Sequence, residues 1–465
     1  MLITTLSGCA TMGFNDLFSS YHKQIQASKQ AMLSGNYVVA LDKLPDYNER
    51  HNSYVLSQLE NGRLYYLMGN WEQSQQSLEV AYEEVEKQRR AAKYQLSRGV
   101  QNVGAVLSND SALDYKIPAY EQGMLHTYQA LNFAFQGDLS ASLVEVRRAN
   151  LVQEQALRDN QQSIDNAKNT LINEGLDVTK LYSAYPDMSG IVGGIKNNFQ
   201  NAFTFYLSGV LYEINGDLND AYIDYKKALE ISPDNKYIQR DVLRLAYALH
   251  MQDELALFKN ELDVSLTEIS KSEMSDGGEA IVIVEQNMVA SRQSVSLNLP
   301  VYTRHSDIRF FSFSLPVYRQ NTVSTSLTLT NNGQSHESQD IVQLQSLAAK
   351  SLVDELPWLL SRQVVRVVAK EELRRKMAKE GGDLGNIIAS IYNVTTEKAD
   401  TRSWSTLPAN VKVIRVPLKH GSQILSLSNG RDVTNVELDV TKNSRHLVNV
   451  IDIGGKLQTR QTVYF

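Results

Sequence analysis

Four basic residues recur at every fourth position in the second half of the chain, where they could bind an anionic group. Arg362, Arg366, Lys370 and Arg374 would lie along one flank of a helix, because residues four apart are neighbours on a helical surface. Lipid headgroups and glycan carboxylates are anions that such a flank could bind. The alternative, which we favour, is a solvated face of a helix whose apolar positions are supplied by neighbouring valines.

A second group of side chains with recognition chemistry lies in the segment Asp400-Thr401-Arg402-Ser403-Trp404. An acid, a base and an indole ring close together, just before a predicted strand, could form a recognition site. In the interpretation that we favour, Asp400 and Arg402 fix a loop, while Trp404 packs on the edge of the strand-rich domain.

Motifs of known catalytic and metal sites are missing from the sequence. It contains no HExxH, paired CxxC, GxSxG or Walker motif, and its 8 histidines show no metal-ligand spacing. Neighbouring carboxylates such as Asp354 and Glu355 are common on helix surfaces and indicate nothing alone. We therefore expect no enzyme, no cofactor and no metal site. A hydrolase whose carboxylates are paired by the fold is the least favoured alternative.

The single cysteine ends the motif Leu6-Ser7-Gly8-Cys9, which resembles the bacterial lipobox. In a lipobox, a signal peptide is cut before the cysteine, which then carries the lipid. Ala10 is compatible with sorting to the outer membrane, since aspartate there usually signals retention in the inner membrane. The residues before Cys9 lack Lys and Arg and are fewer than a normal signal requires. We expect the true signal to begin upstream of the given start; an accidental motif is the alternative.

A glycine-led turn recurs at multiples of the tetratricopeptide period. Gly35, Gly69 and Gly137 are separated by 34 and 68 residues. Small residues such as Gly209 should let two antiparallel helices approach closely, and Gly216 suits the turn between them. The expected framework positions are Gly35, Gly62, Tyr65, Gly69, Ala81, Gly137, Ala149, Phe205, Gly209, Tyr212, Gly216, Ala221, Tyr225, Ala228 and Pro233.

Stacked helix pairs form a superhelix with a concave surface, which commonly binds a partner. Partner contacts are expected at exposed positions of the inner helices, for which His126 is one guess.

The character of the chain changes after about residue 278, where alternating and β-branched segments predict strands. The fold class expected is α+β multidomain, with an N-terminal tetratricopeptide-like α-solenoid and a C-terminal strand-rich, sandwich-like domain. A helical insertion at about 338–379 is expected to be interrupted or kinked at Pro357. The expected divisions are 1–24 (lipobox and tether), 25–155 (degenerate repeats), 156–200 (polar helical connection and Gly-rich loop), 201–270 (repeat block), 271–278 (linker) and 279–465 (strand-rich domain).

Composition narrows the classes of partner. The formal net charge of −6 provides no basic footprint for nucleic acid, and no run of apolar residues after Cys9 is long enough to span a bilayer. With 42% apolar residues, the chain can bury a sizeable core.

The lipobox, the repeats and the strand-rich half with its Asp400–Trp404 segment together resemble a family of Gram-negative outer-membrane lipoproteins with tetratricopeptide repeats. The resemblance implies a lipid-anchored scaffold or adaptor on the periplasmic face of the outer membrane, which binds envelope proteins of a secretion, cell-wall or appendage machine. Assembly of several copies is an option. The alternative is a lipoprotein that binds peptidoglycan or polysaccharide, with Trp404 as a stacking platform.

Overall fold

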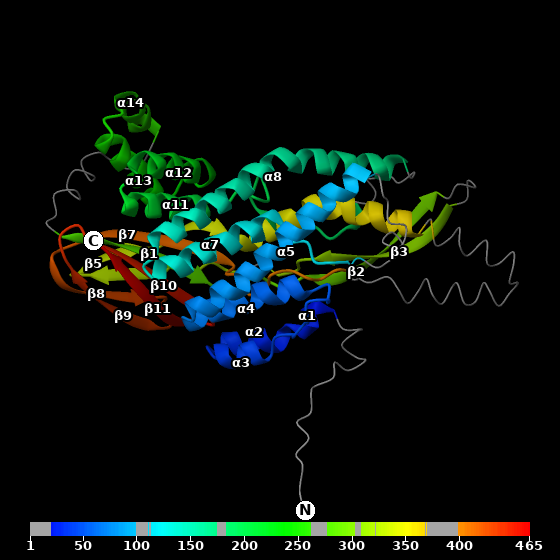
Figure 1. Cartoon of the computed structure of the whole chain (residues 1–465), viewed down its shortest axis with the longest axis horizontal. Helices are drawn as coiled ribbons and strands as arrows, with labels where there is room; N and C mark the ends of the chain where they lie inside the picture. The colour runs from blue at the N-terminus through cyan, green and yellow to red at the C-terminus, as the bar shows by residue number, and fades with distance from the viewer. Residues whose placement is uncertain are drawn as a thin grey trace, which may run out of the picture.

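The computed structural model describes residues 20–98, 110, 113–173, 183–261, 277–302, 308–320, 322–367, 369 and 399–465. Cys9, Lys370 and Arg374 therefore lie outside the described residues. Helices occupy the first half of the chain and most strands lie in the second half, which confirms the expected order of the two classes of structure (Figure 1).

Most of the first half folds into antiparallel helix pairs. Three short helices, α1 (Tyr21–Gln24), α2 (Gln26–Leu33) and α3 (Tyr37–Asp42), precede them. The longer pairs are α4 (Tyr54–Met68) with α5 (Trp71–Arg98), α7 (Ala119–Phe135) with α8 (Leu139–Asn173), α11 (Ala202–Asn215) with α12 (Leu218–Ile231), and α13 (Lys236–Ala248) with α14 (Gln252–Glu261). The short α10 (Ser189–Val192) lies between α8 and α11. Helix α8 extends through residues that were expected to lie beyond the first repeat block.

The glycines of the repeat occupy the places that their spacing predicts. Gly69 and Gly216 end α4 and α11 with φ angles of 78° and 87°, a left-handed conformation that side chains other than glycine rarely adopt. At Gly209 a Cβ atom would lie 2.6 Å from the ring of Tyr225. The predicted close approach of the two helices is therefore confirmed at this position.

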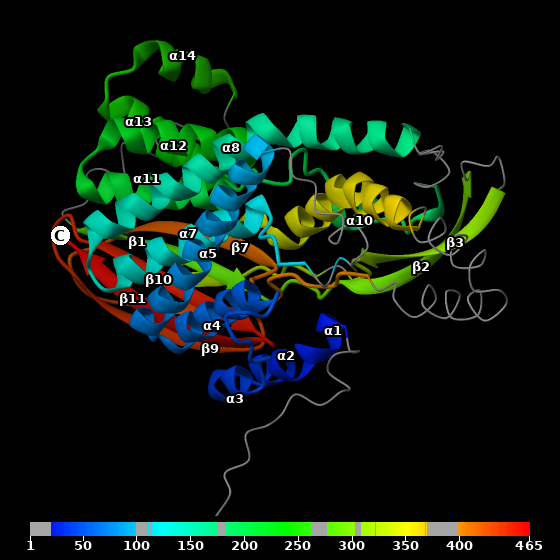
Figure 2. The same cartoon turned by 45° about the vertical axis from the view of Figure 1, so that its right-hand side comes forward.

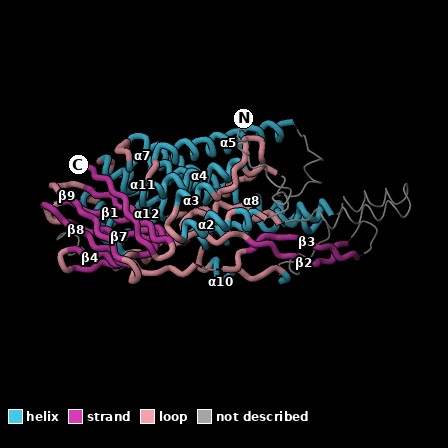
Figure 3. The backbone as a smooth tube through the Cα atoms, turned by 90° about the horizontal axis from the view of Figure 1, so that it is seen from below, coloured by secondary structure: helices cyan, strands magenta, loops and turns pink. Residues whose placement is uncertain are grey.

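The strands form two packed sheets and a separate ribbon. One sheet has the order β11 (Lys456–Tyr464), β10 (Arg445–Ile453), β1 (Gly278–Gln286), β7 (Asn410–Leu418) and β6 (Gln339–Gln343). The second has the order β5 (Gln334–Glu337), β4 (Thr328–Asn331), β8 (Gly421–Ser428) and β9 (Val433–Val440). Strands β2 (Gln293–Tyr302) and β3 (Ile308–Val317) form a ribbon that runs away from the sheets (Figures 2 and 3).

Alternation along β1 assigns its apolar residues to two different cores. Val282 of β1 and Ile414 of β7 pack with Leu427 of β8 between the two sheets, whereas Ile283, the neighbour of Val282, faces the helices. The order of layers is therefore helices, first sheet, second sheet. Strand β1 pairs in parallel with β10 and antiparallel with β7, so it lies in the middle of the first sheet.

A helix over residues 344–367 joins the helical core. Its apolar positions Leu347, Leu352, Leu356, Leu359 and Leu360 are all buried, as their pattern predicts. Two details differ from expectation. Residues 339–343 form strand β6, and the helix continues through Pro357 without interruption, because its last turns still pack on the core.

Candidate binding cleft and the interface that forms it

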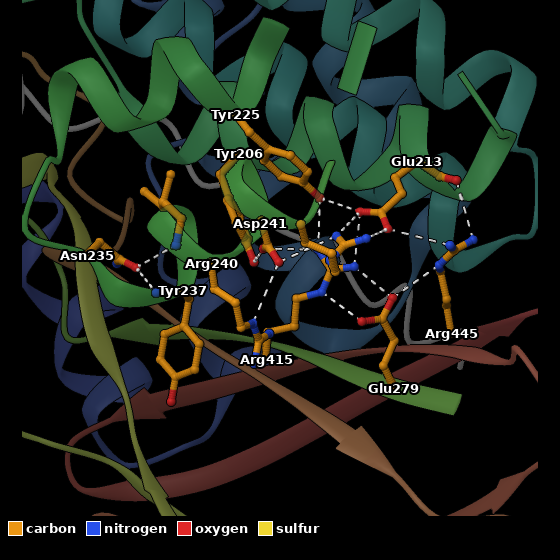
Figure 4. Close-up of polar contacts among 12 residues, drawn as sticks. Tyr206, Glu213, Tyr225, Asn235, Tyr237, Arg240, Asp241, Glu279, Arg415 and Arg445 are labelled. Atoms are coloured by element: carbon orange, nitrogen blue, oxygen red, sulfur yellow. Dashed lines mark hydrogen bonds and ion pairs between the residues drawn. The ribbon is translucent and has the colours of Figure 1, made fainter. Parts of the chain in front are cut away.

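The inner helices of the repeats pack on the first sheet of the same chain. Figure 4 shows Arg415 of β7 reaching the helices, where its guanidinium lies 3.0 Å from a carboxylate oxygen of Glu213 on α11 and 3.0 Å from one of Asp241 on α13. It also pairs with Glu279 of β1 at 2.7 Å, and Arg244 pairs with Glu213 at 2.6 Å. The concave side of the last two helix pairs is thus occupied by the strand-rich half.

The charges of this cluster stabilise one another although they are buried. Burial alone would raise the pKa of Glu213, but the guanidinium groups of Arg244 and Arg415 lower it overall. Burial opposes ionisation of Glu279 as well, yet Arg415 lowers the pKa of Glu279 to about 2. Glu213 and Glu279 are therefore expected to be ionised at neutral pH.

A second buried ion pair joins the first helix pair to the same sheet. Arg63 of α4 lies 2.6 Å from the carboxylate of Glu285 on β1, and neither side chain is more than 1% exposed. Glu285 also accepts hydrogen bonds from Tyr128 of α7 at 2.7 Å and from Asn449 of β10 at 2.8 Å. Helices from two repeats thus bind one carboxylate in the middle of the sheet.

Two buried glutamates hold the segment that precedes β7. Glu60 of α4 accepts hydrogen bonds from the backbone N–H of Ser405 at 3.0 Å and from the hydroxyl group of Thr406. Glu121 of α7 accepts from the backbone N–H of Trp404 at 3.0 Å and from the hydroxyl group of Tyr115 at 2.7 Å. Both glutamates therefore hold, through hydrogen bonds, a backbone segment that belongs to neither sheet.

Within this segment, Asp400 and Arg402 pair with each other at 2.7 Å, and Arg402 donates to the backbone carbonyl of Asn52 at 3.0 Å. Trp404 is fully buried and its ring lies 6.0 Å from that of Tyr128. It packs on the helices rather than on the edge of the sandwich, so its ring presents no face to a sugar in this structure.

Arg362 and Arg366, the two described members of the predicted row of basic residues, also face inward. Arg366 is 1% exposed and pairs with Asp110 at 2.6 Å, and Arg362 lies 3.2 Å from the same carboxylate. His126 is buried as well, with its Nδ1 2.7 Å from Glu145. The guess that His126 is an exposed contact on an inner helix is wrong, because α8 covers it.

Where the helices, the ribbon and the segment at residue 400 meet, they enclose a cleft of about 440 Å³, which we call the junction cleft. This volume lies within the range of pockets that bind small molecules. Helix 344–367, the residues before α7 and the middle of α8 form its walls. Its charged lining residues are Asp110, Asp114, Lys116, Arg292, Asp354, Glu355, Asp400 and Arg402.

Arg292 is the unusual member of this lining. It directly precedes β2, is 6% exposed, and its Nε donates to the hydroxyl group of Tyr318 at 3.2 Å. Its Nη2 has no hydrogen-bond acceptor among the described residues. A buried donor without a partner costs roughly 1–3 kcal/mol, which a suitable ligand or water could offset.

Glu355 also lines the cleft and accepts a hydrogen bond from Ser351 at 3.0 Å. Burial raises the pKa of Glu355, although the charge of Arg292 partly opposes this shift. At the mouth of the cleft, Trp358 is 36% exposed, and its ring centroid lies 4.9 Å from the Arg362 guanidinium and 5.7 Å from the Lys116 ammonium. Apolar residues, among them Ile117 and Leu359, complete the walls.

Sequence reasoning missed this cleft. Arg292 belongs to no recognisable sequence motif. The adjacent acids Asp354 and Glu355 do not indicate a site unless the residues around them in space are known. The lining comes from several segments spread between residues 110 and 402, so no spacing in the sequence could have found it.

Among the described residues, no group of three or more His, Cys, Asp or Glu side chains is arranged to hold a metal ion. Across that same part of the chain, the helices fall short of the length and apolar character that crossing a bilayer requires.

No known family model matches the chain, and comparison with curated proteins finds no match. Two solved structures of MamA match at 12% identity with a TM-score of 0.27 each, covering 53% and 52% of this chain and 95% and 96% of the MamA chains. This TM-score is too low to carry an argument about fold or function.

Proposed function

We propose that the chain is a lipid-anchored scaffold on the periplasmic face of the outer membrane, and that it binds a protein partner at the junction cleft. The lipobox resemblance at Cys9 supports the anchor. The observation that carries the binding role is the cleft itself, with the unpartnered Nη2 of Arg292 in its wall. The concave face at the last two helix pairs, where repeats commonly bind partners, contacts the sheet instead.

We further propose that the cleft binds without catalysing a reaction. Three of its five acids are engaged by neighbouring cations: Asp400 by Arg402 at 2.7 Å, Asp354 by Lys350 at 2.6 Å and Asp110 by Arg366 at 2.6 Å. Carboxylates held in ion pairs are poorly suited to proton transfer, because the pairing stabilises their ionised form.

Photo-crosslinking in cells tests the binding role. A photoreactive amino acid replaces Trp358 at the mouth of the cleft, and the control carries it at Ile223, which is 50% exposed on α12. A defined protein crosslinked from position 358 and not from 223 is the expected result. Equal crosslinking from both positions contradicts a site at the cleft. A crosslink to peptidoglycan would instead favour the polysaccharide-binding alternative.

Fractionation of the same cells tests the anchor. Full-length protein should be found in the outer membrane, and Cys9→Ala should leave that fraction. If both versions stay in the cytoplasm, the lipobox is accidental and the scaffold must work inside the cell.

A further inference from the structure

The structure distinguishes Arg292 from Arg402, the other arginine that lines the junction cleft. Arg402 is engaged by Asp400 and by backbone carbonyls, whereas Arg292 forms no ion pair within 4.0 Å among the described residues. Its Nε is held by Tyr318, which leaves the Nη2 donor unpartnered in the wall. The guanidinium is thus buried, positioned and incompletely satisfied.

Glu355 is an acid of the same cleft, but it does not form an ion pair with Arg292. Among the described residues, Glu355 accepts a hydrogen bond from the hydroxyl group of Ser351, and it lies beyond the 4.0 Å ion-pair distance from Arg292. Both groups line the same cleft, so a ligand there can accept from Arg292 while it lies beside Glu355. Burial also favours the protonated form of Glu355, which reduces its repulsion of an incoming anion.

The cleft that Arg292 lines also has apolar residues in its walls. Ile117, Pro316 and Leu359 line the cleft together with Arg292. A guanidinium next to apolar walls suits a carboxylate attached to an apolar group, because the charge is matched and the apolar surface is removed from water. A carboxylate at the end of a peptide has this form when the last side chain is apolar. An Asp or Glu side chain within a peptide has polar backbone on both sides instead.

We infer that the junction cleft binds the C-terminal carboxylate of a protein partner whose last residue is apolar, with Arg292 as the residue that binds the carboxylate. This inference rests on the proposed function and names the part of the partner that enters the cleft.

Calorimetry with the purified full chain tests the inference with small probes. N-acetyl-phenylalanine carries the free carboxylate, and N-acetyl-phenylalaninamide has the same shape without the charge. The acid should bind about tenfold more tightly than the amide or better, because a hydrogen bond to a charged group is lost with the amide. Equal binding of both probes, or no binding of the acid at about 10 mM, overturns the inference.

Variants locate the binding site. Arg292→Gln should reduce affinity for the acid to that for the amide. The control Lys43→Gln removes one positive charge from a side chain that is 53% exposed and does not line the cleft, so it should bind as wild type does. Because Arg292→Gln could impair folding, Ala156→Phe provides a second variant, which fills the cleft from α8 and leaves Arg292 in place. Loss of acid binding in Ala156→Phe, with an unchanged thermal unfolding curve, supports the site. Unchanged acid binding in Ala156→Phe overturns it.

Two further ligands distinguish the source of the carboxylate. A tetrapeptide ending in a free phenylalanine should bind more tightly than phenylacetate if a chain end is the natural ligand. Tighter binding of phenylacetate would overturn the assignment to a chain end in favour of a small acid. These measurements need no protein partner, so they are independent of the crosslinking experiment. Absence of probe binding with crosslinking from position 358 would contradict this inference alone, whereas probe binding without crosslinking would contradict the proposed function.

Discussion

At the scale of single residues, the buried carboxylates do different work according to their neighbours. Glu213 faces arginines and its pKa is lowered, whereas Glu121 is surrounded by hydroxyl groups and a backbone N–H. Burial raises the pKa of Glu121 to about 7, although the hydrogen bonds from Tyr115 and Trp404 oppose the shift. Near neutral pH, Glu121 is therefore close to half protonated.

This shift predicts how stability depends on pH. The folded state holds the Glu121 proton up to about pH 7, while the unfolded chain releases it near the ordinary value of 4.5, so the contribution is full below 4.5 and is lost as pH rises through 7. The loss should reach about 3 kcal/mol in the free energy of unfolding. Urea unfolding of wild type and Glu121→Gln at several pH values measures it. A stability difference between the two proteins that does not change with pH would refute the assignment.

At the scale of elements, the repeat depends on positions where two helices pack very closely against each other. Gly209 on α11 lies against the Tyr225 ring of α12, and the Cβ of any other residue would lie 2.6 Å from it. Gly123 is also inside a helix, α7, but a Cβ there would meet nothing within 4 Å. Substitutions at the two glycines therefore distinguish the effect of helix packing from the effect of helix propensity.

Alanine substitutions at these glycines should act in opposite directions. Gly209→Ala should destabilise the protein by about 1–3 kcal/mol, because the overpacked helices must move apart. Gly123→Ala should stabilise it by up to about 1 kcal/mol, since alanine is the better helix former. Thermal or urea unfolding followed by circular dichroism gives both values. A stabilised Gly209→Ala protein would mean that the pair is less tightly packed than described.

At the scale of the whole molecule, the helical half and the strand-rich half share one core. Arg415 illustrates this, because it stands on a strand and contacts carboxylates of two helices from different repeats. The side chains that join the halves are charged, buried and mutually paired. Breaking one such pair leaves the remaining charges uncompensated, which costs more than the pair itself contributes.

Arg415→Gln should therefore lower the free energy of unfolding by about 3–5 kcal/mol. Arg445→Gln is the matched control, because Arg445 contacts Glu213 and Glu279 as well, but its side chain is 31% exposed, so the loss should stay below about 1 kcal/mol. Urea unfolding of the two variants compares them. Equal small losses would show that the helices and the sheet are not coupled through Arg415.

Local patterns in the sequence predicted a good part of the fold. The glycine spacing located the helix turns, the leucines of 344–367 predicted its buried face, and alternation identified the long strands. These features repeat with the period of a helix or a strand, so short-range geometry determines them. Strand β6 was missed, because a strand of five residues at the start of a helix leaves little periodic signal.

The amino-acid sequence by itself determined the two classes of element, their order along the chain and the close helix contacts at the repeat glycines. Tertiary structure alone decided that the inner helices close on the sheet, that Trp404 and Arg366 point inward, and that Arg292 reaches a cleft beside Glu355. The physical reason is sequence distance. Periodicity records which face of an element is buried, but it holds no information about which distant element covers that face.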